Sequence, residues 1–489
     1  MTQLTEETVM VTNVAQMAEH NKDALDLQRI FTSQQKAYRA NPMPTADERI
    51  EHIKRLKPAL LKYMPALEQA ISDDFSNRSV SETKVAEMMS CLEAIKYHIK
   101  HVKKWMQDDK RHVPAAFKPA KAKVVYQPLG VVGIIVPWNY PVYLAMGPLL
   151  PALAAGNRVM IKMSEFTPRT SEIFKQMIAE VFPEDHVAVV TGEADVAMAF
   201  TKLPFNHILF TGSTSVGKHV MRAAAENLTP VTLELGGKSP AIISESFPMN
   251  EAAERLSFGK ALNVGQTCIA PDYILCPQNK VDTLVDEFKT VISKWYPTMR
   301  NNDDYSAVIN DRQHQRLQGY LKDAEEKGAT VIAINPANED FAGTRKMPIT
   351  LVLNTNEDML VEQDEIFGPI LIIKPYESLD EAINYVNDRP RPLALYYFDF
   401  NDSRADYVLR HTHSGGVCIN DSISHVAVDD MPFGGVGPSG MGAYHGKEGF
   451  LTFSQAKGVY IKGKFNSTKM IYPPWNRSIH KFLFKAMLK

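Results

Sequence analysis

Two cysteines that stand eight positions apart in the segment NVGQTCIAPDYILC have different surroundings. Cys268 follows Gly-Gln-Thr, a small polar turn that leaves backbone N–H groups available, and it stands at the edge of an apolar run. Cys276 lies inside that run, where a buried thiol behaves as a small, unreactive apolar side chain. We therefore predict that Cys268 is a nucleophile and that Cys276 is structural.

Two further residues have the chemistry to assist such a thiol. Glu234 ends the apolar run VTLELG before two glycines, and desolvation there would raise its pKa, as suits a general base near neutral pH. The alternative is a solvent-facing glutamate at the end of a strand. Asn139, in PWNYP, lies in a turn between a buried strand and a helix. Its amide can donate to an oxyanion, or it can cap the helix.

The segment FTGSTSVGK joins a strand to a helix and is a candidate phosphate site. Gly212 and Gly217 allow a close approach of the backbone, and free N–H groups at a helix start attract phosphate, so a dinucleotide could bind here. The pattern is neither G-x-G-x-x-G nor a P-loop, which leaves an ordinary glycine-rich turn as the alternative. Lys162 and Glu165, in IKMSE, could contact ribose hydroxyls or could be surface charges.

The elements that must position these residues alternate between strand and helix. Apolar β-rich runs separate segments with helical spacing, and this predicts an α/β fold with a doubly wound parallel sheet covered on both faces. The expected strands are 157–164, 186–192 and 207–212, and the expected helices are 168–182, 194–203 and 215–227. A second alternating block follows, with helices near 250–263, 281–295 and 379–388 and a last strand at 415–421.

A chain of 489 residues is too long to fold around one hydrophobic core, and its length therefore predicts two large domains. We place their boundary near Leu235–Lys238. Before the first block, Thr45 and Glu48 form a capping box, and helical spacing predicts helix from about 45 to 107. Residues 477–489 form a basic amphipathic helix, which would dock on the protein or a partner subunit, with contact to a membrane surface as the alternative.

Composition excludes several classes of protein. The formal net charge of -2 gives no global reason to bind nucleic acid, and a basic cluster at 100–123 suits a solvated face. The four cysteines lack the C-x2-C spacing of a metal site, which predicts no metal, reduced thiols and a cytoplasmic location. The first 16 residues do not have the pattern of a signal peptide, and Pro and Gly break every long apolar stretch, so we expect no transmembrane segment.

A papain-like thiol hydrolase is the alternative enzyme. His413 and Asn420 follow Cys268 by 145 and 152 residues, near the spacing of that class. The usual motif around the cysteine is missing, and a hydrolase has no use for a phosphate-binding turn. A non-enzymatic α/β binding protein would leave Cys268, Glu234 and Asn139 without a joint role.

The order and spacing of these motifs resemble the aldehyde dehydrogenase family from about residue 25 to about residue 460. The matching stretches are PWNYP, IKMSE, FTGSTSVG, LELGGK, NVGQTC, EIFGP and PFGGVGPSGMG. Seven motifs in register are highly specific, although IKMSE departs from the proline that the family usually has before the serine. GQTCIAPDYILC and GMGAYHGKEGFLTFS resemble the class 3 branch, and SHVAVDDMPFGGVGPSGMG is most similar to its coniferyl aldehyde dehydrogenases.

The resemblance implies oxidation of an aldehyde to a carboxylic acid through a thiohemiacetal and a thioester on Cys268. Asn139 would hold the oxyanion, and Glu234 would activate the hydrolytic water. It implies NAD as cofactor, because Glu165 would repel a 2′-phosphate, with NADP also possible. The implied cofactor contacts are Lys162 and Glu165 at the adenine ribose, Trp138 and Ser213 at the pyrophosphate side, and Glu365 and Phe367 at the nicotinamide ribose. Gly212 and Gly217, in the turn described above, are also predicted to bind the cofactor.

The resemblance also implies an organisation in three parts. A cofactor domain would cover 1–113 and 137–235, a catalytic domain 236–425, and a small β oligomerisation element with the tail 114–136 and 426–489. A homodimer is expected. The substrate would be an apolar aldehyde, aromatic and similar to coniferaldehyde, with a long-chain fatty aldehyde as the alternative.

Overall fold

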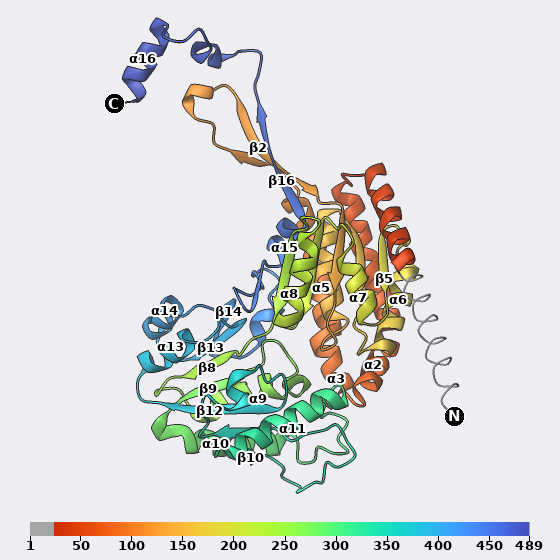
Figure 1. Ribbon diagram of the computed structural model, residues 1–489, viewed down its shortest axis with the longest axis vertical. Helices are drawn as coiled ribbons and strands as arrows, with labels where there is room; N and C mark the ends of the chain where they lie inside the picture. Colours follow the sequence, from red (N-terminus) through yellow and green to blue (C-terminus); the bar gives the residue numbers. More distant parts are fainter. Residues whose placement is uncertain (1–23, 489) are drawn as a thin grey trace, which may run out of the picture.

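The computed structural model describes residues 24–488, so the prediction about a signal peptide in the first 16 residues lies outside the described part. Within it the strands form sheets of six, seven and three strands. Figure 1 shows the two large sheets with their helices in two adjacent bodies, and the small sheet as an arm that projects away from them.

Helices cover the start of the described chain. A helix spans 24–40, and α2 begins after the capping box in which Thr45 and Glu48 bond each other's backbone N–H groups. The predicted helical region is interrupted, because Ser76 takes a left-handed conformation (φ 60°) that ends α2. A π-helical turn then precedes the last helix. The elements are α2 (Ala46–Phe75), α3 (Val80–Thr83), η1 (Lys84–Met89) and α4 (Ser90–Trp105).

The six-stranded sheet has the order β15-β7-β6-β3-β4-β5, and all its strands except β15 run parallel. β3 is buried along its whole length, as its continuous apolar sequence predicts for a strand covered on both faces. The strands are β3 (Val131–Ile135), β4 (Arg158–Lys162), β5 (Val187–Val190), β6 (His207–Gly212), β7 (Val231–Leu235) and β15 (Gly440–Met441). The helices between them are α5 (Tyr143–Ala155), α6 (Pro168–Val181), α7 (Ala194–Thr201) and α8 (Thr214–Ala225).

The seven-stranded sheet has the order β10-β11-β12-β9-β8-β13-β14 and is parallel except at its β10 edge. The chain enters it directly after β7, through residues 236–239. Its strands are β8 (Pro240–Ile243), β9 (Tyr273–Pro277), β10 (Thr330–Ala333), β11 (Thr350–Leu353), β12 (Ile370–Tyr376), β13 (Ala394–Phe398) and β14 (Gly416–Ile419). Its helices are α9 (Met249–Ala261), α10 (Val281–Trp295), α11 (Asp311–Glu326), α12 (Leu360–Gln363), α13 (Leu379–Asn387) and α14 (Asp402–His411). The predicted α/β fold is confirmed.

The third sheet is antiparallel and forms the arm. It contains β1 (Asp109–Arg111), β2 (Lys121–Pro128) and β16 (Ser454–Ile461), and α15 (Gly446–Thr452) leads into β16. The amphipathic helix α16 (Ser478–Met487) lies at the far end of this arm (Figure 1). Trp475 and Phe482 there are each 67% exposed. Between residues 24 and 488, no helix combines the length and the apolar character that a membrane crossing requires.

Candidate active site

A pocket of about 260 Å³ opens at the carboxyl ends of β6 and β7, where α/β sheets commonly bind ligands. It brings together chain segments more than two hundred residues apart. Eight of the eleven site residues predicted from the sequence line it: Trp138, Asn139, Gly212, Ser213, Glu234, Cys268, Glu365 and Phe367.

The other three predicted residues do not line this pocket. Lys162 ends β4 with 1% exposure, and its Nζ donates to the Met163 carbonyl at 2.6 Å, while burial lowers the pKa of its ammonium. Glu165 is half-buried a few residues later and raises that pKa in part. Gly217 lies in α8, where an added Cβ would come within 2.7 Å of the Leu235 side chain. The absence of a side chain at Gly217 therefore lets α8 pack closely on β7.

The pocket also contains residues that the sequence motifs did not indicate. Gln313 and Arg316 reach it from α11. Arg316 donates to the backbone carbonyls of Glu365 (3.3 Å) and Ile366 (2.7 Å), which holds the EIFGP segment in place. α11 is a strongly polar helix with no glycine-rich or strand-end signature, so its sequence carried no signal of this contact.

The loop before Cys268 has an unusual backbone. Asn263, Val264 and Gly265 follow one another with φ of 49°, 45° and 75°. A left-handed conformation is costly for a β-branched residue such as valine, by roughly 1–3 kcal/mol, and such strain concentrates at functional sites. The Gln266 side chain stabilises the loop, because it donates to the carbonyls of Asn263 (3.1 Å) and Ala307 (3.0 Å).

The Cys268 thiol is held in its neutral form. Burial, together with the nearby carboxyls of Glu365 and Glu234, raises its pKa to about 12. The N–H groups of Cys268 and Ile269 act in the opposite direction, because they stabilise negative charge on sulfur. A base or a bound positive group must therefore help to form the thiolate.

This thiol predicts a specific pH dependence of alkylation in the cofactor-free protein. Since only the thiolate reacts, the rate constant for alkylation of Cys268 by iodoacetamide should rise ~10-fold per pH unit from about pH 7 to about pH 10. Cys276, buried in β9, should stay unmodified in the native protein. Peptide mass spectrometry of pH-dependent time courses measures both sites. A Cys268 rate that levels off near neutral pH would contradict this electrostatic environment.

Glu234 is a buried carboxyl at the end of β7. It is 3% exposed, and within the part of the chain that the structure describes neither of its oxygens has a hydrogen-bond partner. Burial raises its pKa well above the ordinary value for glutamate. The alternative of a solvent-facing strand-end glutamate is therefore wrong, because this carboxyl is desolvated. Glu365, on the same pocket, has its pKa raised by burial to about 7.

The Asn139 side chain does not cap the following helix. Its Nδ2 donates to the Gln266 carbonyl at 3.2 Å, which orients the amide nitrogen toward the loop of Cys268. The N–H groups at the start of α5, on Val142 and Tyr143, instead donate to the Glu87 carboxylate at 2.8 and 3.0 Å. The capping alternative for Asn139 is therefore wrong.

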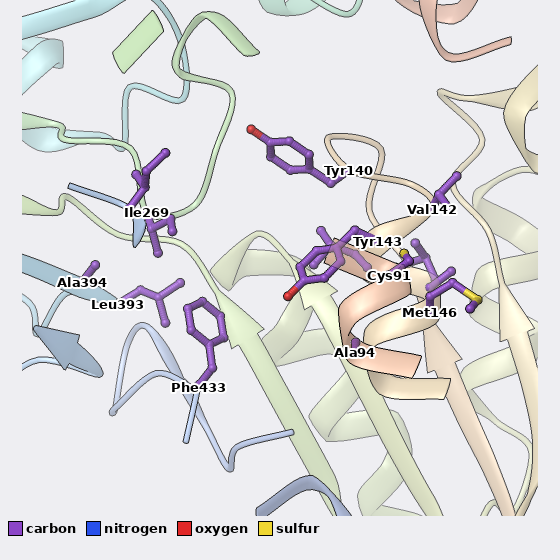
Figure 2. Packing of buried hydrophobic residues seen from close by; sticks show 14 of the residues in the cluster. Cys91, Ala94, Tyr140, Val142, Tyr143, Met146, Ile269, Leu393, Ala394 and Phe433 are labelled. Carbon is purple, nitrogen blue, oxygen red and sulfur yellow. The ribbon is translucent and has the colours of Figure 1, made fainter. Parts of the chain in front are cut away.

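Aromatic side chains pack beside the Cys268 loop. Figure 2 shows Tyr140 and Tyr143 facing a group that includes Ile269, Leu393 and Phe433. Tyr140 is also tied to the residue before the cysteine, since its Oη lies 2.7 Å from Thr267 Oγ1. These surroundings of the loop are apolar and aromatic.

The residues of the hydrolase alternative are not part of the site. His413 is exposed, and Asn420 accepts the Asp399 N–H at 2.7 Å through its side chain. Neither residue lines the pocket with Cys268. The predicted absence of a metal site stays a prediction, although the described residues contain no group of three or more His, Cys, Asp or Glu side chains placed to bind one.

Comparisons with known proteins identify the family of this chain. The aldehyde dehydrogenase family model matches residues 6–459. A probable coniferyl aldehyde dehydrogenase of Pseudomonas aeruginosa is 57% identical over 98% of this chain and 100% of its own, and a coniferyl aldehyde dehydrogenase of a Pseudomonas species is 47% identical over 89% and 91%.

Solved structures are similar as well. A substrate-bound AldH of Staphylococcus aureus has a TM-score of 0.89 at 35% identity and covers 94% of this chain and 99% of its own. A Mycobacterium tuberculosis aldehyde dehydrogenase complexed with NAD+ has a TM-score of 0.82 at 28% identity, with 91% of each chain covered. The chain therefore belongs to the aldehyde dehydrogenase family and is an oxidoreductase of that family.

Proposed function

We propose that this protein oxidises an apolar aldehyde to the carboxylic acid with NAD, and that Cys268 is the nucleophile. The observation that carries the proposal is the meeting of three groups in one pocket: a thiol, an oriented amide and a buried carboxyl without a hydrogen-bond partner in the described chain. The same pocket contains Gly212 and Ser213, where β6 joins α8. A hydrolase would not need this strand–helix junction.

In the proposed reaction the Cys268 thiol loses its proton to water, its sulfur attacks the aldehyde carbon, and the carbonyl oxygen becomes an oxyanion. One N–H of the Asn139 amide is bonded to Gln266, so the other N–H can donate to that oxyanion, together with the Cys268 N–H. A bound NAD, held by residues such as Glu365 and Phe367, would supply the acceptor for the hydride that leaves the carbon of this thiohemiacetal. A thioester then remains on Cys268.

Glu234 would complete the turnover as a general base. Its carboxylate takes a proton from a water molecule, the resulting hydroxide adds to the thioester carbon, and the carbon–sulfur bond breaks. The acid leaves and the thiol is restored when the sulfur regains a proton. The raised pKa of Glu234 supports this role, because a base that holds its proton only weakly is a poor acceptor at neutral pH.

The residues at the cofactor side fit a dinucleotide. The N-terminus of α8 offers N–H groups to a pyrophosphate, beside Ser213 and Trp138. Gly236 leaves room for the Glu365 carboxyl, which an added Cβ would meet at 2.1 Å, and Glu365 and Phe367 line the same pocket. This supports the proposal that both bind the nicotinamide ribose. Lys162 and Glu165 would bind the adenine ribose, with Glu165 favouring NAD while NADP is also accepted. The NAD+ complex of the M. tuberculosis relative supports this cofactor.

An aromatic aldehyde is the proposed substrate. Tyr140 bonds Thr267, the residue before the cysteine, and Tyr143 and Phe433 belong to the hydrophobic cluster on which Cys268 packs. Aromatic surfaces of this kind stack on a phenyl or propenyl group. The names of two Pseudomonas relatives support coniferaldehyde. A long-chain fatty aldehyde would use the same apolar surroundings.

Exposed side chains on the arm support a proposed assembly. β2 and β16 carry exposed residues, and Tyr460 and Ile461 are 52% and 44% exposed, which supports a homodimer in which the arm and the tail from 114–136 and 426–489 pack on a second copy. The first two sheets would be the cofactor domain (1–113 and 137–235) and the catalytic domain (236–425). The free cysteines support a cytoplasmic enzyme, with α16 against the partner subunit rather than a membrane.

The test is absorbance of the reduced nicotinamide with purified protein, NAD or NADP, and a panel of acetaldehyde, octanal, decanal, benzaldehyde and coniferaldehyde. We expect kcat/KM to be ~10-fold or more higher for the aromatic propenal than for acetaldehyde, from the apolar area that binding would bury. If kcat/KM were highest for decanal, the proposed substrate would be a fatty aldehyde instead of an aromatic one. No reduction with any aldehyde and either cofactor would overturn the proposal.

A further inference from the structure

Three buried charged side chains lie beside the pocket and have no part in the steps above. Arg78 is in the break after α2, and its side chain is 0% exposed. Glu82 and Glu87 follow it, Glu87 from the π-helical turn η1. π-helical turns are rare in proteins, and many of those that occur lie at functional sites. Burying a charged side chain costs free energy unless the charge is paired and hydrogen-bonded. The hydrogen bonds of these three side chains therefore indicate which parts of the chain they hold in place.

Arg78 and Glu87 bond the loop that carries Asn139. Arg78 Nη1 donates to Glu87 Oε1 at 2.9 Å and to the Asn139 carbonyl at 3.0 Å. Glu87 Oε2 accepts the N–H groups of Val142 and Tyr143, which begin the next helix. The guanidinium also lies 4.6 Å from the centre of the Tyr140 ring. The backbone on both sides of Asn139 is therefore attached to this ion pair.

Glu82 attaches the same arginine to the loop that carries Cys268. Its Oε1 accepts from Arg78 Nε at 3.3 Å and from the Asn263 N–H at 2.9 Å. Asn263 Nδ2 then donates to the Asn139 carbonyl at 3.0 Å and to the Gln266 carbonyl at 3.3 Å. Since Gln266 also receives the Asn139 amide, the two loops and the cluster form one hydrogen-bonded unit.

The positive charge of Arg78 stabilises the negative charges of both Glu82 and Glu87. Burial raises the pKa of both glutamates, and the positive charge of Arg78 opposes that shift. For Arg78, burial acts to lower the pKa, but Glu87 and Glu82 outweigh it and the pKa is raised. A planar guanidinium can serve two carboxylates and a carbonyl at once, whereas a lysine ammonium is a single point charge.

We propose that Arg78 is a positioning residue that holds the Asn139 amide in register with the Cys268 thiol. It touches neither reacting atom, and it would act through the Asn139 backbone and, through Glu82, on the strained loop at 263–265. This inference rests on the proposed role of Asn139 as the oxyanion donor. Loss of Arg78 should therefore slow the addition of sulfur to a carbonyl without weakening substrate binding.

The test is a double-mutant cycle on acylation. Para-nitrophenyl acetate acylates a thiolate and releases nitrophenolate without any cofactor, so the first-turnover rate constant reports the addition step alone. Asn139→Ala should lower this constant by ~100-fold or more. R78K, which keeps the positive charge for both glutamates and so favours folding, should lower it by ~10-fold in the wild type but by less than about two-fold in the Asn139→Ala background. The KM for coniferaldehyde should change little.

Arg49→Lys is the matched control. Arg49 is also a buried arginine, but it donates to the carbonyls of Ala154 (3.0 Å) and Ala155 (2.6 Å), far along α5 from the Asn139 loop. Its substitution should lower the thermal stability of the protein. The acylation rate constant per titrated thiol should stay within about two-fold of the wild-type value. Equal losses from R78K in both backgrounds, or no loss in the wild type, would overturn the role of Arg78. An unchanged constant in Asn139→Ala alone would instead overturn the oxyanion role of Asn139.

Discussion

Replacement of Cys268 by alanine is expected to lower the rate of aldehyde-dependent NADH formation by about 10⁴-fold or more. A free aldehyde is a poor hydride donor, because its carbon is planar and electron-poor. Addition of the thiolate converts it to a tetrahedral alkoxide, which releases a hydride readily. An alanine methyl group cannot form that adduct. Absorbance of the reduced nicotinamide at saturating coniferaldehyde measures the loss, and mass spectrometry of the acylated protein identifies the modified cysteine.

Cys276→Ala is the control for this result. Cys276 has 0% exposure in β9, where its neighbours are apolar. The substitution removes one sulfur atom from the core and should lower the melting temperature by a few degrees, about 1 kcal/mol, while most of the activity remains. If Cys276→Ala abolished oxidation while Cys268→Ala did not, the assignment of the nucleophile would be reversed.

Replacement of Glu234 by glutamine is expected to separate the two halves of the reaction. The first hydride transfer should proceed as a burst of about one NADH per subunit, because Cys268 and Asn139 are unchanged. Steady-state turnover should fall by ~10²- to 10⁴-fold, since the glutamine amide cannot take a proton from water. Rapid-mixing absorbance measures the burst and the steady state in one experiment.

The pH dependence of the steady state gives a second measure of Glu234. Its carboxylate is the active form of a base, and burial raises its pKa, so thioester hydrolysis in the wild type should increase as pH rises through that raised value. Glutamine does not titrate, and the variant should lose this dependence. Glu365→Gln is the control, because burial raises the pKa of Glu365 to about 7 in the same pocket and this residue is proposed to bind the cofactor. If Glu365→Gln removed the pH dependence and Glu234→Gln did not, the base assignment would move to Glu365.

The sequence alone determined the fold class, the family and most of the pocket lining. These depend on local patterns: the period of apolar residues along β3 to β7, the turn residues at strand ends, and short motifs such as LELGGK. The sequence also predicted that Cys276 is buried within the apolar run and that Cys268 stands at its edge, where the thiol is partly exposed. The interruption of the N-terminal helical region could not be predicted from the sequence. The left-handed turn that ends the helix is formed by Ser76, and no glycine or proline stands there to mark it.

Only the tertiary structure decided which distant groups meet. Arg78 became a candidate because it bonds the Asn139 carbonyl, 61 residues away, and Arg316 because it bonds the carbonyl of Glu365. Gly217 matched a motif, yet it packs against Leu235 rather than facing the pocket. The raised pKa values of Cys268 and Glu234 likewise come from burial by segments far along the chain. Desolvation and hydrogen bonding depend on three-dimensional neighbours, and one-dimensional spacing does not specify them.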